Sequence, residues 1–239
     1  MNTARTHFLA GFRGGLPFLL VLIPFSLLFG VLAVETGLDL GQTMAMSALV
    51  IAGASQFTAL QLIADNAPLL VALVTALAVN LRMAMYSASL AAHLGHAPLW
   101  QRALVAYTLV DQTYGASITY FQDRPGLGLR DKLAFYSGAV LAVCPAWYVF
   151  TFVGAVAGTA IPEALALDFA VPVTFLALVA PQLKSLAHVT AALVSVVLAL
   201  ALAWMPFGLG LLVAAGCAML AGAAVETWGP GRPRQEARP

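Results

Sequence analysis

Charged residues are scarce in this chain of 239 residues: only 9% are Asp, Glu, Lys or Arg, whereas a soluble domain carries about 25%. Hydrophobic residues make up 62% of the sequence, and the mean hydropathy is +0.92. A chain of this composition has too few polar side chains to cover a water-exposed surface, which excludes a soluble globular fold. The sequence therefore predicts an all-α integral membrane protein, because helices satisfy their own backbone hydrogen bonds in lipid.

Other absences narrow the function classes. The two cysteines, Cys144 and Cys217, lie in apolar runs and are expected to act as small apolar side chains. The net charge of +1 gives no sign of nucleic-acid binding, and no Gly-rich loop ending in Gly-Lys-Ser/Thr is present to bind ATP. The histidines have no HExxH spacing and none lies deep beside a Ser or Cys in the sequence. We therefore expect neither an enzyme nor a bound cofactor or metal.

Apolar runs long enough to cross a bilayer are frequent. A helix needs about 20 residues to cross roughly 30 Å of hydrocarbon. Eight transmembrane helices are predicted, at residues 17–34, 43–64, 68–90, 103–121, 133–157, 164–181, 187–203 and 207–224. The first is longer than the apolar region of a signal peptide and is expected to be retained. We predict one polytopic transmembrane domain over residues 1–226 and a short disordered tail, rich in Gly, Pro and charge, over 227–239.

Basic residues predict the topology, because short cytoplasmic loops collect Lys and Arg. The segment 103–121 is the most amphipathic, yet without it the basic cluster at 124–132 would lie outside. With eight spans and a cytoplasmic N-terminus, the outer loops hold only Arg102, and both termini are cytoplasmic. The cytoplasmic side then holds Arg5, Arg13, Arg124, Arg130, Lys132, Lys184, Arg232, Arg234 and Arg238.

Polar side chains inside the predicted spans are candidates for function, because a charge at mid-membrane costs roughly 2.5–3.5 kcal/mol on insertion scales. Arg82 and Asp111 come out at the same depth, roughly 12 Å below the outer surface at the helical rise per residue. They are predicted to pair, either as a structural pin between adjacent helices or as part of a transport pathway. The candidate residues are Gly53, Ser55, Gln56, Asn80, Arg82 and Asp111.

The stretch 52-AGASQF-57 carries small residues directly before a glutamine. Small residues either allow close helix packing or permit a local break of the helix. Gln56 needs hydrogen-bond partners in hydrocarbon, which favours a binding site over plain packing. A helix broken near Gly53 would point backbone N–H groups and its positive end at an anionic group such as a carboxylate.

Several stretches together resemble one known family. They are 11-GFRGGLPF-18, 24-PFSLLFGVLA-33, 46-MSALVIAGASQFTAL-60, 78-AVNLRMAMYSASLAAHL-94, 109-LVDQTYG-115 and 205-MPFGLGLLVAAGCAMLAG-222. The chain is similar to the AzlC family, the large subunits of bacterial two-component branched-chain amino-acid exporters. The resemblance implies an inner-membrane permease that works with a small hydrophobic AzlD-type subunit and exports valine, leucine, isoleucine or, in some members, methionine. Gln112 stands where the family leads us to expect an acidic residue, which argues against a two-carboxylate proton relay there.

The resemblance and the polar residues together give a site hypothesis. The AGASQF segment binds the ammonium and carboxylate of an amino acid, and Asn80 and Arg82 face it from the next helix. Arg82 is a carboxylate partner or a gate, while Asp111 is an ammonium partner, a proton carrier or a counter-ion to Arg82. Energy comes from a proton or other ion gradient, or from the substrate gradient itself. The alternative is a channel, or an assembly or receptor-like membrane subunit that transports nothing itself.

Overall fold

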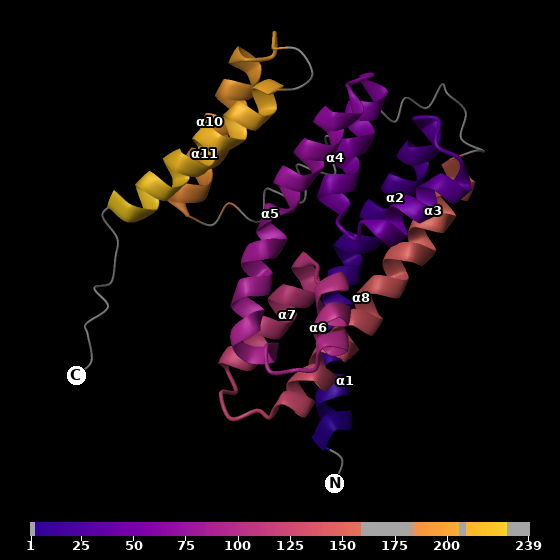
Figure 1. Cartoon of the computed structure of the whole chain (residues 1–239), viewed down its shortest axis with the longest axis vertical. Helices are drawn as coiled ribbons and strands as arrows, with labels where there is room; N and C mark the ends of the chain where they lie inside the picture. The colour runs from indigo at the N-terminus through magenta and orange to yellow at the C-terminus, as the bar shows by residue number, and fades with distance from the viewer. Residues whose placement is uncertain (1–2, 159–182, 184, 206–208, 229–239) are drawn as a thin grey trace. The chain divides into compact units, whose positions relative to one another are not determined.

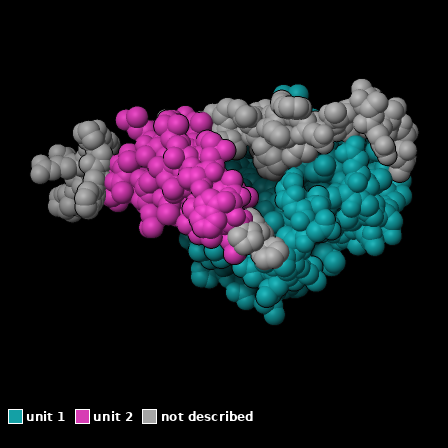
Figure 2. Space-filling view, turned by 90° about the horizontal axis from the view of Figure 1, so that it is seen from above, with its two compact units in different colours: residues 1–167 teal, residues 168–239 magenta. Residues whose placement is uncertain are grey.

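The computed structural model describes residues 3–158, 183, 185–205 and 209–228, and all the regular elements in these ranges are helices. The all-α prediction is therefore confirmed. Contacts divide the chain into two units, residues 1–167 and 168–239, coloured separately in Figure 2. The second unit contains α10 (Leu186–Ala201) and α11 (Leu209–Trp228). The first contains α1 (Thr3–Gly15), the 3-10 turn η1 (Leu16–Phe18), α2 (Leu19–Glu35), α3 (Leu40–Leu49), α4 (Gly53–Ala64), α5 (Leu69–Leu94), α6 (Leu99–Tyr107), α7 (Asp111–Gln122) and α8 (Leu129–Gly158).

Within the described residues, the helical stretches long and apolar enough to cross a membrane are Ala4–Glu35, Leu69–Leu94, Leu129–Gly158 and Leu209–Thr227. The helix α10 is apolar but shorter. These helices match the first, third, fifth, seventh and eighth predicted segments. The predicted segment 164–181 lies outside the described residues, as does most of the predicted tail. Because α11 continues to Trp228, residues 227 and 228 are helical and not part of that tail.

Close packing of the α1–α2 stretch on α8 organises the first unit, and Figure 1 shows these elements side by side. A Cβ built at Gly11 or Gly138 would lie 1.9 or 2.0 Å from a backbone oxygen of the opposite stretch. Gly30 and Gly154 repeat the arrangement further along, at 2.2 and 2.1 Å. Glycines at such positions let membrane helices approach backbone to backbone. This seam explains why the first helix begins at Thr3 and not at the predicted residue 17: its N-terminal turns also pack on α8.

Two of the predicted spans are interrupted. The segment 43–64 is split into α3 and α4 by residues 50–52, which confirms the break expected near Gly53. The segment 103–121 is split into α6 and α7 by residues 108–110, so the prediction of one continuous fourth helix was wrong. The residues of this second break are buried, although α6 itself has no buried residue. A buried break persists only where other groups replace the lost helical hydrogen bonds.

Candidate functional site

The first break brings two helix ends of opposite polarity together. Ala52, the residue before α4, has φ −153° and ψ 87°, far from helical values, and its side chain offers no cap to the following N–H groups. The last carbonyls of α3 carry a partial negative charge, and the first N–H groups of α4 a partial positive charge. Only residues 50–52 separate them. The break can therefore attract an anionic group at one end and a cationic group at the other.

Gln56 crosses this break. Its side chain is fully buried, and Nε2 donates a hydrogen bond of 3.3 Å to Oγ of Ser47 on α3. The amide oxygen Oε1 is buried and has no hydrogen-bond partner. Leaving a buried acceptor unpaired costs about 1–3 kcal/mol, so such an atom marks a place where a donor belongs. Next to it, Ser55 Oγ donates to the carbonyl oxygen of Ala76 on α5 at 2.9 Å.

Aromatic rings pack behind the break. A Cβ added to Gly53 would lie 2.6 Å from the Phe25 ring and 2.9 Å from the Trp147 ring, so only glycine fits at the start of α4. Phe57 lies 4.6 Å from Phe25, centroid to centroid. Trp147 is 5% exposed, and its Nε1 has no hydrogen-bond partner. The break is thus walled by apolar surface that contains one unsatisfied donor.

Hydroxyl groups hold the second break. Thr113 Oγ1 accepts a hydrogen bond of 3.0 Å from the N–H of Val110 and lies 3.1 Å from the carbonyl oxygen of Thr108. Tyr136 of α8 donates to the carbonyl oxygen of Val105 at 2.9 Å. These side chains replace the helical hydrogen bonds that residues 108–110 lack. The sequence analysis did not predict that these hydroxyl groups stabilise a break, although the Thr, Ser and Tyr residues within 103–121 were the available sign of it.

The predicted pair of charges is present at the start of α7. Arg82 Nη2 lies 3.0 Å from Asp111 Oδ2, and the two side chains are 32% and 42% exposed. Asp111 is the first residue of α7, where the positive helix end adds to the attraction of the guanidinium. Arg82 Nε and Asp111 Oδ1 are buried atoms without a hydrogen-bond partner. The pair therefore has hydrogen-bonding capacity left for another group.

One helix contacts both breaks. The Ala76 carbonyl of α5 receives Ser55, and Asn80, one turn later, shares that face of α5. Arg82 lies on another face and reaches α7, where Tyr86 also stacks on Tyr114 with centroids 4.1 Å apart. Of the two residues expected to face the AGASQF segment, Asn80 therefore lies on the face of α5 that contacts it. Arg82 instead contacts Asp111 on α7. Ala76 and Arg82 are six positions apart, which is about 9 Å along the helix.

A tyrosine ties the two breaks directly. Tyr107, the last residue of α6, donates from its hydroxyl to the carbonyl oxygen of Ala48 in the last turn of α3, at 2.7 Å. Its hydroxyl also lies 3.2 Å from that of Tyr148 on α8. Neither tyrosine was a candidate from the sequence, and no sequence pattern marks them. Helix ends from two distant segments therefore meet in one cluster within the first unit.

These features define a helical membrane protein with two interrupted helices joined by the hydrogen bond from Tyr107 to Ala48, and with an ion pair between α5 and the start of α7. A model of the family described as AzlC protein matches residues 17–161, which include both breaks and every candidate residue. The chain belongs to the AzlC family, and the resemblance seen in the sequence is confirmed.

Relatives of known name agree with a membrane location. The chain is 26% identical to the inner membrane protein YgaZ of Escherichia coli over 218 residues, 88% of either chain. It is 32% identical to a membrane protein of Archaeoglobus fulgidus over 200 residues, 80% of this chain and 84% of the relative. A membrane protein of Helicobacter pylori is 27% identical and covers 74% of this chain and 78% of its own length. No solved structure matches the chain.

Proposed function

We propose that the chain is the large subunit of an inner-membrane exporter of the branched-chain amino acids valine, leucine and isoleucine, with methionine as a further candidate substrate. The observation that carries this proposal is the first break with the buried, half-satisfied Gln56 across it. An amino acid is a zwitterion, and the break offers opposite partial charges a few residues apart. The N-terminal end of α4 suits the carboxylate, while the C-terminal end of α3 and Gln56 Oε1 suit the ammonium group.

The surroundings of the break favour an apolar substrate. Phe25, Phe57 and Trp147 pack around Gly53, so a bound molecule meets apolar surface beside the polar helix ends. Apolar walls with a few placed polar groups are typical of small-molecule sites. The choice of branched-chain substrates rests on the family resemblance, and the inner-membrane location is supported by the name of the Escherichia coli relative.

Transport is proposed to be secondary, driven by a proton or other ion gradient or by the substrate gradient itself. Asp111 is a titratable carboxylate inside a membrane protein, the type of group that proton coupling uses. Its pairing with Arg82 and its unpartnered Oδ1 fit a proton carrier, an ammonium partner or a counter-ion. The small AzlD-type subunit and cytoplasmic positions for both termini are parts of the same proposal, as is the absence of enzyme activity.

Export from preloaded cells tests the proposal. Cells without their own branched-chain exporters would express the chain with and without its small partner. We expect efflux of valine, leucine, isoleucine or methionine that requires the partner. Gln56→Leu should abolish it, because the variant keeps the volume but removes both polar atoms. Gln61→Leu is the matched control, since Gln61 is exposed on the same helix.

The other outcomes discriminate between classes. No efflux of any of these amino acids, from protein shown to be in the membrane with its partner, would refute the proposal and favour an assembly or receptor-like role. Efflux that only ever follows the substrate gradient and does not saturate would favour a channel. Equal loss of export in Gln56→Leu and Gln61→Leu would remove the first break from the mechanism.

A further inference from the structure

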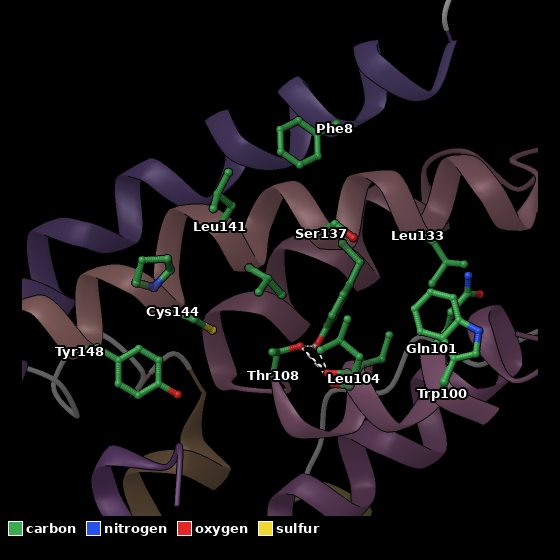
Figure 3. A pocket seen from close by; sticks show the side chains of 14 residues that line it. Phe8, Trp100, Gln101, Leu104, Thr108, Leu133, Ser137, Leu141, Cys144 and Tyr148 are labelled. Carbon is green, nitrogen blue, oxygen red and sulfur yellow. Dashed lines mark hydrogen bonds between the residues drawn. The ribbon is translucent and has the colours of Figure 1, made fainter. Parts of the chain in front are cut away.

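A long groove lies between α6 and α8 of the first unit, with a volume of about 380 Å³ (Figure 3). Its α8 wall runs from Leu133 to Tyr148 at helical spacing, which is about 22 Å at 1.5 Å per residue. Its volume falls within the range of about 300–1,000 Å³ typical of small-molecule pockets. Among its fourteen lining residues are Gln101, Leu104 and Thr108 on the α6 side and Tyr136, Cys144 and Tyr148 on α8.

The chemistry of this groove is apolar. None of its lining residues, all within the described range 3–158, is charged. Its polar side chains are uncharged: Tyr136 is engaged with the carbonyl of Val105, and Gln101 is the one amide among the lining residues. The groove is therefore unsuited to the charged groups of a zwitterion but well suited to an aliphatic side chain.

One end of the groove lies beside both breaks. Thr108 lines the groove and is the first residue of the second break. Tyr148 lines the same end, as Figure 3 shows, and its hydroxyl meets that of Tyr107. Tyr107 in turn binds the carbonyl of Ala48, the neighbour of the residue that Gln56 contacts across the first break. The last turn of α3 is therefore linked to this end of the apolar groove through the hydroxyl groups of Tyr107 and Tyr148.

We propose that this groove receives the aliphatic side chain of the transported amino acid, while the ammonium and carboxylate stay at the first break. The inference rests on the proposed function and adds the residues that set its selectivity. Leu104 on α6 and Cys144 on α8 lie on opposite walls of the groove (Figure 3). Their size limits which side chains enter, because one methylene in an apolar pocket changes discrimination by about 10–200-fold.

Substitutions that change the width of the groove test this inference. Cys144→Phe should narrow it and lower the ratio of leucine to valine export by about tenfold or more, since the two side chains differ by one methylene. Leu104→Ala should widen it and raise the ratio of methionine to valine export severalfold. Leu77→Ala is the control: Leu77 is 68% exposed on α5 and lies outside the groove. Export of the four amino acids would be measured together from preloaded cells that contain the small partner.

Each result decides a different point. If the wild-type chain exports none of the four amino acids, the proposed function fails and the groove inference fails with it. If it exports them but both groove variants keep the wild-type ratios, the function stands and the groove inference is overturned. Equal loss of all four amino acids would also overturn the groove inference, because it changes no ratio; loss of co-purification of the small partner would then assign the groove to a helix of the partner, and unchanged co-purification to a lipid tail. If Cys144→Phe does not reach the membrane, Leu104→Ala decides alone, because Leu104 is 55% exposed and packs loosely.

Discussion

Removing Arg82 and Asp111 together should restore most of the stability that is lost when either one is removed alone. In Arg82→Gln, the Asp111 carboxylate keeps its charge but loses the guanidinium 3.0 Å away. In Asp111→Asn, the Arg82 guanidinium keeps its charge but loses the carboxylate. The double variant has neither charge. Within an apolar protein, two neutral amides lower the free energy of unfolding less than one unpaired ion does.

The geometry sets the size and order of the effects. A lone charge at mid-membrane costs roughly 2.5–3.5 kcal/mol, and we reduce this to about 1–2 kcal/mol per single variant because both side chains are about a third or more exposed. Asp111 alone would still lie at the positive end of α7, which is worth about 0.3–1 kcal/mol. Arg82 alone would face that same positive end. Asp111→Asn should therefore be the more destabilising single change.

Unfolding of the four purified proteins in detergent measures this cycle, and export measures the role of the pair. A coupling energy of about 1 kcal/mol or more is expected from the cycle. Additive effects, or a larger loss in Arg82→Gln, would refute the reasoning. A stable double variant that exports normally identifies the pair as a structural pin, whereas a stable but inactive one places it in the transport pathway.

Three further changes test the packing and the breaks. Gly154→Ala puts a Cβ 2.1 Å from a carbonyl oxygen of α2 and should lower the free energy of unfolding by about 1–3 kcal/mol or more. Gly115→Ala is the control: it has open space around it and should be neutral or stabilising. Equal effects of the two changes on the free energy of unfolding would contradict the close packing of α2 on α8. Thr113→Val leaves the buried N–H of Val110 unpaired and should lower the free energy of unfolding by about 1–3 kcal/mol. Thr119 is exposed on the same helix, so Thr119→Val should have little effect in the same unfolding assay. Tyr107→Phe removes the hydrogen bond to Ala48, worth about 0.5–1.5 kcal/mol, and should speed amide hydrogen exchange in the last turn of α3. Unchanged exchange there would mean that Tyr107 does not stabilise the contact between the two breaks.

Much of the fold and part of the candidate site could be predicted from the sequence. Composition alone shows that lipid is the solvent, and lipid requires helices. Gln56, Arg82 and Asp111 are conspicuous because polar groups are rare in apolar spans. The contact between Arg82 and Asp111 was expected because each charge needs a partner in an apolar span, although the depth estimate assumed a continuous helix over 103–121 that the structure breaks at 108–110. The break near Gly53 was expected for a similar reason: small residues beside a polar side chain mark a weak point in a helix.

The sequence by itself thus determined the solvent, the helices and the residues that need a polar partner. Only the tertiary structure decided which partner each one has. The second break exists because Thr113 and Tyr136, from different helices, replace its lost hydrogen bonds. The link between the breaks depends on Tyr107 reaching Ala48, 59 residues away in the chain. The apolar groove is the space between two helices. Such contacts carry no local pattern, because an aromatic or hydroxyl side chain in an apolar run reads as ordinary packing until its neighbours are known.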